Sequence, residues 1–214
     1  EIMVDRPVKI GVIGVGFGAV VQIPGFQSEG LDVVAVCAKH EDRAKETASK
    51  FGIPNYFTDY NQMLNTKDID AVSIVAPHHL HSEMALAVLA AGKHLLCEKP
   101  MAVDSHEAKS MWNASQKSHC TAMIGHEFRW APQRSYVKEL LDEGYIGGLR
   151  FVKSSLLVGA SKVVKPRVLQ NPDLGHRGGF LWALGSHYID GFRHWFGDIS
   201  RVNATMHSHS PERV

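Results

Sequence analysis

Short apolar segments rich in β-branched residues alternate with amphipathic segments along the first 125 residues. The predicted strands span residues 8–13, 32–37, 55–59, 70–76, 94–97 and 120–125. Helical patterns occupy residues 41–51, 60–64, 82–92 and 104–118, and a further one follows the first strand. Strands that alternate with helices are typical of parallel sheets, because each helix returns the chain to the edge where the next strand begins. We therefore predict an α/β fold, with a doubly wound parallel sheet in a first domain of residues 1–125.

Residues that commonly begin or end helices stand at the edges of these helical patterns. Gly52 follows one of them and Gly92 ends another, and glycine is the usual residue where a helix stops. Asp104 is followed three residues later by Glu107, a spacing that forms a capping box at a helix start. These residues support the predicted helix boundaries.

The pattern changes after residue 125. Helices are predicted over residues 132–144 and 180–197, and strands over residues 149–159 and 201–209. Two strands do not make an independent sheet, so we predict that residues 126–214 form an incomplete α+β second domain. Either another copy of the chain completes this domain, or the sequence is a fragment. An isolated monomer would leave apolar surface and unpaired amides exposed, so we expect a homo-oligomer that associates through the second domain.

A glycine-rich turn joins the first strand to the helical pattern that follows it. It contains the predicted phosphate-binding residues Gly14, Gly16, Phe17, Gly18 and Ala19. In a dinucleotide-binding (Rossmann) domain, the first glycine permits a tight turn, the second lets the backbone approach the pyrophosphate, and the third small residue allows close helix packing. A turn kept for packing alone is the alternative. The second strand follows within the length of one βαβ unit, which favours a nicotinamide dinucleotide as cofactor.

The end of the second strand bears on the choice of cofactor. Enzymes that use NAD usually carry an acidic residue there, which binds the ribose hydroxyls. Here the strand ends with Cys37 and is followed by Ala38, Lys39 and His40, with Arg43 nearby. Loss of the carboxylate and gain of positive charge favour a 2′-phosphate, so we predict that NADP is preferred and that NAD is possible.

Composition and charge narrow the class of partner. A net charge of +1 and 21% charged residues give no sign of a nucleic-acid or membrane surface. No apolar run is long enough to span a bilayer, and the short acidic start does not resemble a signal peptide, so we expect a cytoplasmic protein with a small-molecule partner. Cys37, Cys97 and Cys120 lack CxxC spacing and are expected to be reduced thiols.

The histidines raise the question of a metal. The chain has 13, including His78, His79 and His81 within one short segment. Their spacing matches no closed set of zinc ligands, and no cysteine joins them. We therefore predict no metal site.

The segment APHHLHSEMALAVLAAGKHLLCEKP (residues 76–100) resembles the signature of the Gfo/Idh/MocA family, which includes glucose-fructose oxidoreductase and inositol dehydrogenase. The segment GHEFRWAPQ (125–133) resembles the family's entry into its second domain, and Gly185, His187 and Asp190 match a GxHxxD helix. The resemblance implies an NAD(P)-dependent oxidoreductase that acts on a sugar, cyclitol or related polyol. It also implies a second domain built on an open, largely antiparallel sheet, much of which this sequence lacks.

Lys99 is the strongest catalytic candidate. It follows a strand's carboxyl end, the edge where open α/β sheets bind ligands, and its ammonium could exchange a proton with a substrate hydroxyl. Pro100 favours an extended backbone at Lys99, and the bond between them could be cis. The resemblance makes Lys99 the acid/base, places Glu98 near the nicotinamide, and puts Pro77 and His81 beside the cofactor.

The residues expected to bind the substrate are those that the resemblance implies. His126, Arg129 and Trp130 would line the pocket, and a tryptophan can stack on a sugar ring. His187 would assist Lys99 in proton transfer, with Asp190 three residues further on the same helix to orient it.

One position departs from the family pattern. Many of its dehydrogenases carry an aspartate four residues before this histidine, and Ala183 stands there. Two alternatives therefore stay open. One is a redox-assisted lyase or glycosidase that retains its cofactor, and the other is a non-catalytic protein that senses nucleotides.

Overall fold

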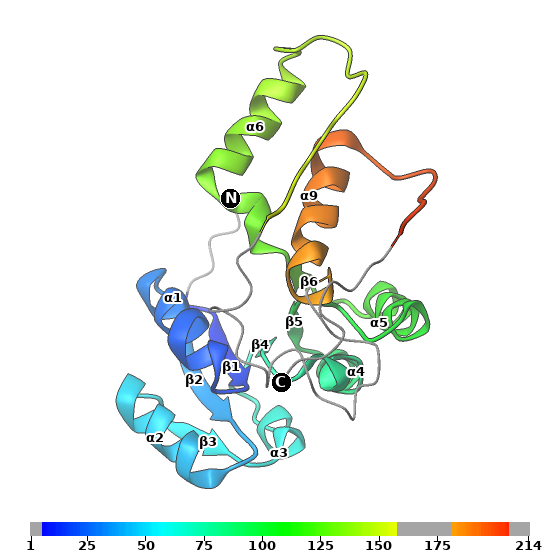
Figure 1. Ribbon diagram of the computed structural model, residues 1–214. Helices are drawn as coiled ribbons and strands as arrows, with labels where there is room; N and C mark the ends of the chain where they lie inside the picture. Colours follow the sequence, from blue (N-terminus) through cyan, green and yellow to red (C-terminus); the bar gives the residue numbers. More distant parts are fainter. Residues whose placement is uncertain (1–5, 158–180, 206–214) are drawn as a thin grey trace, which may run out of the picture. The chain divides into compact units, whose positions relative to one another are not determined.

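The computed structural model describes residues 6–157 and 181–205 (Figure 1). The chain divides into two compact units. Within the described ranges, the first unit contains residues 6–126 and 181–186, and the second contains residues 127–157 and 187–205. None of the described helices is long and apolar enough to cross a membrane.

The first unit contains a six-stranded sheet in which every neighbouring pair is parallel, in the order β3-β2-β1-β4-β5-β6. The strands are β1 (Lys9–Ile13), β2 (Asp32–Cys37), β3 (Asn55–Phe57), β4 (Ala71–Ile74), β5 (His94–Glu98) and β6 (Ala122–Gly125). All six coincide with predicted strands, and the order is that of a doubly wound Rossmann sheet. The predicted fold class is therefore confirmed.

Two hydrophobic cores cover the sheet. One joins β1 and β2 to the helices that follow them, and the other joins β4 and β5 to α3, α4 and α5. Val12 and Ile13 are neighbours in β1 but enter different cores, because successive strand residues point to opposite faces. Burial on both faces explains why these strands read as continuous apolar runs rather than as alternating ones.

The helices of the first unit lie close to their predicted bounds. They are α1 (Ile23–Ser28), α2 (Glu41–Phe51), α3 (Tyr60–Leu64), α4 (His81–Ala90) and α5 (Ser105–Lys117). Gly52 ends α2 in the left-handed conformation, with φ 66°. The Asp104 side chain accepts hydrogen bonds from the amides of His106 and Glu107, and Glu107 accepts one from the amide of Val103. Gly52 and Asp104 thus act as predicted, while Glu107 binds the amide one residue before the cap.

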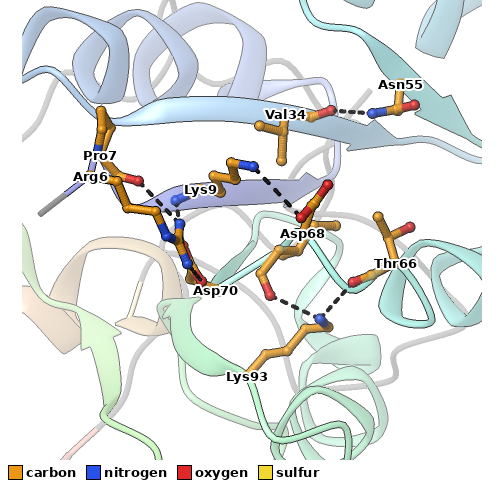
Figure 2. Close-up of polar contacts among 10 residues, drawn as sticks. Arg6, Pro7, Lys9, Val34, Asn55, Thr66, Asp68, Asp70 and Lys93 are labelled. Carbon is orange, nitrogen blue, oxygen red and sulfur yellow. Dashed lines mark hydrogen bonds and ion pairs between the residues drawn. The ribbon is translucent and has the colours of Figure 1, made fainter.

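A polar network ties together the chain around the amino ends of β1 and β4 (Figure 2). Asp70 accepts two hydrogen bonds of 2.7 Å from the Arg6 guanidinium and one of 2.9 Å from the amide of Lys9. Lys93, only 6% exposed, donates bonds of 2.9 Å to the carbonyls of Thr66 and Ile69. Burial lowers the pKa of Lys93, and the two carbonyls compensate for its lost hydration. The network fixes the loop that leads into β4.

The second unit is helical in its described part. It contains the short turn η3 (Glu127–Trp130), α6 (Pro132–Asp142) and most of α9 (Ser186–Phe196), which follows the π-helical turn η5 (Leu181–Gly185). The Arg134 guanidinium lies 4.8 Å from the ring centres of both Phe128 and Tyr188. The indole of Trp195 donates to the carbonyl of Arg134. These contacts join η3, α6 and α9.

The strands predicted for the second domain are not formed in its described part. Residues 149–157 and 201–205 have no regular secondary structure, while residues 158–159 and 206–209 of the two predictions lie outside the described ranges. A strand needs a neighbour that pairs with its amides and carbonyls. The described part of this unit offers only helices and irregular chain as neighbours, so apolar content alone did not produce a strand. Phe151 and Leu157 are accordingly 81% and 93% exposed.

Candidate functional site

The order of the strands locates the candidate site. The chain runs outward from β1 to β3 and then returns to place β4 on the other side of β1. At such a switch point the connections leave in opposite directions, and the carboxyl ends of the two strands border the crevice where ligands bind. The glycine-rich turn follows β1 at this edge, and Val75 and Ala76 follow β4.

Gly14 is required by the fold itself. Its φ is 104°, a region that favours glycine, and a Cβ atom there would lie 2.5 Å from the carbonyl oxygen of Val75. Its amide donates a 2.8 Å hydrogen bond to the carbonyl of Cys37 at the end of β2. The turn is therefore packed between the ends of two neighbouring strands, as the first glycine of the pattern predicts.

Gly16 has no such internal reason to be glycine. It is exposed, its φ is not positive, and a Cβ atom would have no heavy atom within 4 Å. Gly18 is different, because a Cβ atom there would lie 3.2 Å from Cγ1 of Val12. Ala19 packs on the core beside β1, while Phe17 is 48% exposed. Open space around Gly16 leaves its backbone accessible to a ligand.

The helix after the turn begins with an irregularity. Residues Gly18–Gln22 form a π-helical turn (η1), in which the amide of Ile23 donates to the carbonyl of Gly18. Pro24 follows and has no N–H to continue the regular pattern. Such turns are frequent at functional sites. The last residue of this turn is Gln22, which the sequence analysis missed, although an amide within the apolar run AVVQI was a signal.

Glu98 and Lys99 lie at the end of β5. Glu98 is only 9% exposed, and its carboxylate accepts a 2.7 Å bond from Nε2 of Gln22 and a 3.2 Å bond from the amide of Lys99. The ammonium of Lys99 donates a 2.8 Å bond to the carbonyl of Ala183. The Lys99–Pro100 bond is cis, the alternative raised from the sequence. The structure thus brings Lys99 close to the position that departs from the family pattern.

His81 contacts the Lys99–Pro100 segment and is only 1% exposed. Its Nδ1 is 2.9 Å from the carbonyl oxygen of Pro100, and its Nε2 is 2.8 Å from that of Ala76. Burial lowers the pKa of His81, and the two carbonyls act in the opposite direction. Both ring nitrogens are thus engaged by the main chain, and the residue ties the end of β4 to the Lys99–Pro100 segment. Pro77 stands between Ala76 and the short turn η2 (His78–Leu80), and is exposed.

None of the three residues that follow β2, residues 38–40, carries a carboxylate. Ala38 is half-buried and its amide donates to the carbonyl of Phe57, while Lys39 and Arg43 are exposed. Glu41 and Asp42 belong to the first turn of α2, where acidic side chains complement the helix dipole.

The remaining predicted site residues belong largely to the second unit. His187 is 2% exposed and stacks on Phe128 with ring centres 3.9 Å apart, and its Nε2 lies 3.7 Å from a carboxylate oxygen of Glu127. Arg129 and Asp190 form two hydrogen bonds of 2.5 Å, which raise the pKa of Arg129. The sequence analysis expected Asp190 to orient His187. In the structure, the carboxylate of Asp190 accepts these two bonds from Arg129. Sequence reasoning gave no role to Glu127 or Phe128.

Two further predicted residues differ in setting. Trp130 is 69% exposed, with its ring 6.4 Å from that of His194. His126 belongs to the first unit, and its amide donates to the carbonyl of Ile124. Across residues 6–157 and 181–205, no group of three histidine, cysteine or acidic side chains could hold a metal ion.

Comparison with known proteins assigns the family. A family model described as an oxidoreductase family with an NAD-binding Rossmann fold, GFO/IDH/MocA, matches residues 8–126, more than half of the chain. The chain belongs to the GFO/IDH/MocA family. The model of this family's C-terminal domain matches residues 135–214.

Relatives in this family include dehydrogenases of sugars and cyclitols. Levoglucosan dehydrogenase of Pseudarthrobacter phenanthrenivorans is 32% identical over 96% of this chain and 55% of its own length. A structure of levoglucosan dehydrogenase in complex with NADH and levoglucosan matches 97% of this chain and 59% of that chain, with 29% identity and a TM-score of 0.82. Myo-inositol 2-dehydrogenase from Lactobacillus plantarum matches 67% of this chain and 43% of that chain, with 28% identity and a TM-score of 0.63. The chain spans about half the length of the curated relatives it matches.

Proposed function

We propose that this GFO/IDH/MocA chain binds a nicotinamide dinucleotide and serves an oxidoreductase that acts on a sugar, cyclitol or related polyol. The proposal follows the relatives, which include dehydrogenases of levoglucosan and myo-inositol. The candidate phosphate-binding turn and Lys99 lie in the same unit, at the carboxyl ends of its strands.

Gly16 is the observation that carries the cofactor assignment. Gly14 is glycine because of backbone conformation and close packing, but neither reason applies to Gly16. A glycine that the fold does not need, at the edge where α/β sheets bind ligands, fits the close approach of a pyrophosphate to the main chain.

Lys99 is the proposed acid/base. The bound nicotinamide would supply the hydride acceptor, or the donor in the reverse direction. As a neutral amine, Lys99 would take the hydroxyl proton while the same carbon loses its hydride, and as an ammonium it would return the proton in the reverse reaction. The carbonyl of Ala183 and the bonds around Glu98 would hold Lys99 in place. His187 is proposed to assist it.

NADP is the proposed preferred cofactor. Ala38 offers no carboxylate to the ribose hydroxyls, and the exposed Lys39 and Arg43 could pair with a 2′-phosphate. The levoglucosan and scyllo-inositol dehydrogenase structures hold NAD(H), so this preference would be a property of the present chain.

Association through the second unit is also proposed. The described part of this unit exposes several large apolar side chains: Tyr145, Ile146, Phe151 and Leu157 are all more than half exposed. Exposed apolar side chains favour contact with another copy when they gather on one surface. Sedimentation velocity at several concentrations tests this, and a concentration-independent monomer would contradict it.

The cofactor proposal is tested by paired glycine substitutions. Gly16→Ala places a methyl group in the space proposed for the pyrophosphate, whereas Gly25→Ala places one in equally open space on α1. Titration of NADPH and NADH by fluorescence should show affinity reduced about tenfold or more for Gly16→Ala, equal to about 1.4 kcal/mol, and unchanged for Gly25→Ala. Equal affinities in the two variants would remove Gly16 from the binding site.

A further inference from the structure

Gln22 connects three elements that are far apart in the sequence. It ends the π-helical turn η1, it accepts a hydrogen bond from the hydroxyl of Ser73 in β4, and it donates one of 2.7 Å to Glu98 at the end of β5. Both ends of its amide are therefore used. All of these residues belong to the first unit.

The Glu98 carboxylate determines which way the amide faces, because it can only accept and therefore requires Nε2 of Gln22. The hydroxyl of Ser73 donates to Oε1 and anchors the other end of the amide. If the amide were reversed, its oxygen would face the carboxylate, two acceptors with no proton between them. Ser73 is 1% exposed and is a polar residue within a buried strand, which is costly unless it is hydrogen-bonded.

The Glu98 carboxylate is held in a confined place. Gly125 pairs with Glu98 in the sheet, and a Cβ atom on Gly125 would lie 3.3 Å from Oε1 of Glu98. The other carboxylate oxygen accepts the amide of Lys99. The position of this carboxylate thus sets the position of the main chain at Lys99.

We propose that Gln22 is a positioning residue, which, anchored by Ser73, fixes the carboxylate of Glu98 and through it the backbone of Lys99. The catalytic consequence rests on the proposed function, in which Lys99 is the acid/base. The positioning itself does not depend on that function. Its sequence of contacts is Ser73 hydroxyl to Gln22 amide, Gln22 amide to Glu98 carboxylate, and Lys99 amide to the same carboxylate.

The amide proton of Lys99 provides a direct test in the full chain. Its ¹H–¹⁵N signal depends on the charge of the carboxylate that it binds. Gln22→Glu places a second carboxylate against that of Glu98, and two carboxylates at hydrogen-bond distance resist ionising together. We expect the pH midpoint of the Lys99 signal to move to higher pH in this variant. Gln27→Glu is the matched control. Gln27 lies in the following helix, α1, and its side-chain amide donates to the carbonyl of Phe51.

Two variants without a new charge guard against misfolding of Gln22→Glu. Gln22→Met keeps the length of the side chain but loses both bonds, and Ser73→Ala removes only the bond that anchors the amide oxygen. Both should shift the Lys99 signal at constant pH, with Ser73→Ala giving the smaller change. An unchanged Lys99 signal in Gln22→Met, or an unmoved midpoint in a folded Gln22→Glu, would overturn the proposal.

Cofactor titration separates this result from the proposed function. A wild-type chain that binds neither NADPH nor NADH would overturn the proposed function, while the Lys99 signals would still decide whether Gln22 positions Glu98. If the wild type binds cofactor and the Lys99 signal is the same in the Gln22 variants as in the wild type, only the positioning role is overturned.

Discussion

The ammonium of Lys99 donates a 2.8 Å hydrogen bond to the main-chain carbonyl of Ala183. The family pattern quoted in the sequence analysis has an aspartate at this position in many dehydrogenases. This chain has Ala183, so the acceptor here is a neutral main-chain carbonyl. A carbonyl can orient an ammonium but cannot balance its charge or take its proton. The contact between Lys99 and Ala183 is therefore a hydrogen bond and not an ion pair.

Replacing Lys99 tests its proposed role as acid/base. Lys99→Met keeps most of the aliphatic chain and should lower the turnover number about 100-fold or more, the scale of a lost proton-transfer group, with little change in cofactor affinity. Steady-state kinetics with levoglucosan or myo-inositol and NAD(P)⁺ measure the rate. Lys67→Met, at an exposed lysine, is the control. Turnover equal to that of the wild type would exclude Lys99 from proton transfer.

A carboxylate at the end of β2 should change cofactor choice. Ala38→Asp places a negative charge where we propose the 2′-phosphate binds, and it should weaken NADPH binding about tenfold or more relative to NADH, equal to about 1.4 kcal/mol. Ala38→Asn has the same shape without the charge and should cause a much smaller change. Fluorescence titration of both cofactors measures the ratio. The idea fails if the two variants give the same ratio.

Gly14→Ala should destabilise the first unit strongly. The methyl group would lie 2.5 Å from the carbonyl oxygen of Val75, and φ is 104°. We expect the free energy of unfolding in urea to fall by about 3 kcal/mol or more, since strain and overlap combine. Gly52→Ala is the comparison, because Gly52 also has a positive φ but open space around it. Strain alone should cost it only about 1 kcal/mol.

Acid should weaken the network around Asp70. The hydrogen bonds from Arg6 lower the pKa of Asp70 from 3.8 to about 2. Because the folded-state pKa is the lower one, this stabilisation is complete above pH 3.8 and is lost as the pH falls through about 2. Arg6 is 57% exposed, so solvent screening limits the effect to about 1 kcal/mol.

Asp70→Asn isolates that contribution. The variant should unfold more easily than the wild type at pH 6, and the difference should shrink as the pH is lowered from 4 toward 2. Asp68→Asn, at a carboxylate that is 80% exposed, should show little difference at any pH. Urea unfolding followed by circular dichroism measures both, and a difference for Asp70→Asn that stays constant with pH would contradict the assignment.

The sequence alone determined the elements of the first unit and the residues at its sharpest turns. The segments 32–37, 41–51 and 60–64 were predicted with the bounds that the structure has. Gly14, Gly52 and the Asp104 cap were also recognised. Most of these features leave a local record in the sequence, such as apolar runs, helix periodicity and capping residues, which a linear pattern shows.

Only the tertiary structure decided which distant side chains meet. Gln22 and Glu98 are 76 positions apart, and Gln22 and Ser73 are 51 apart. Their contact depends on the register of β4 and β5 and on the π-helical turn, none of which a local pattern specifies. Residues 149–157, the described part of the strand predicted over 149–159, form no strand for the same reason, because a strand forms only where another segment pairs with its backbone. Lys99 could thus be selected from its sequence motif, but the carbonyl that holds its ammonium and the carboxylate that holds its amide depended on how the chain folds back on itself.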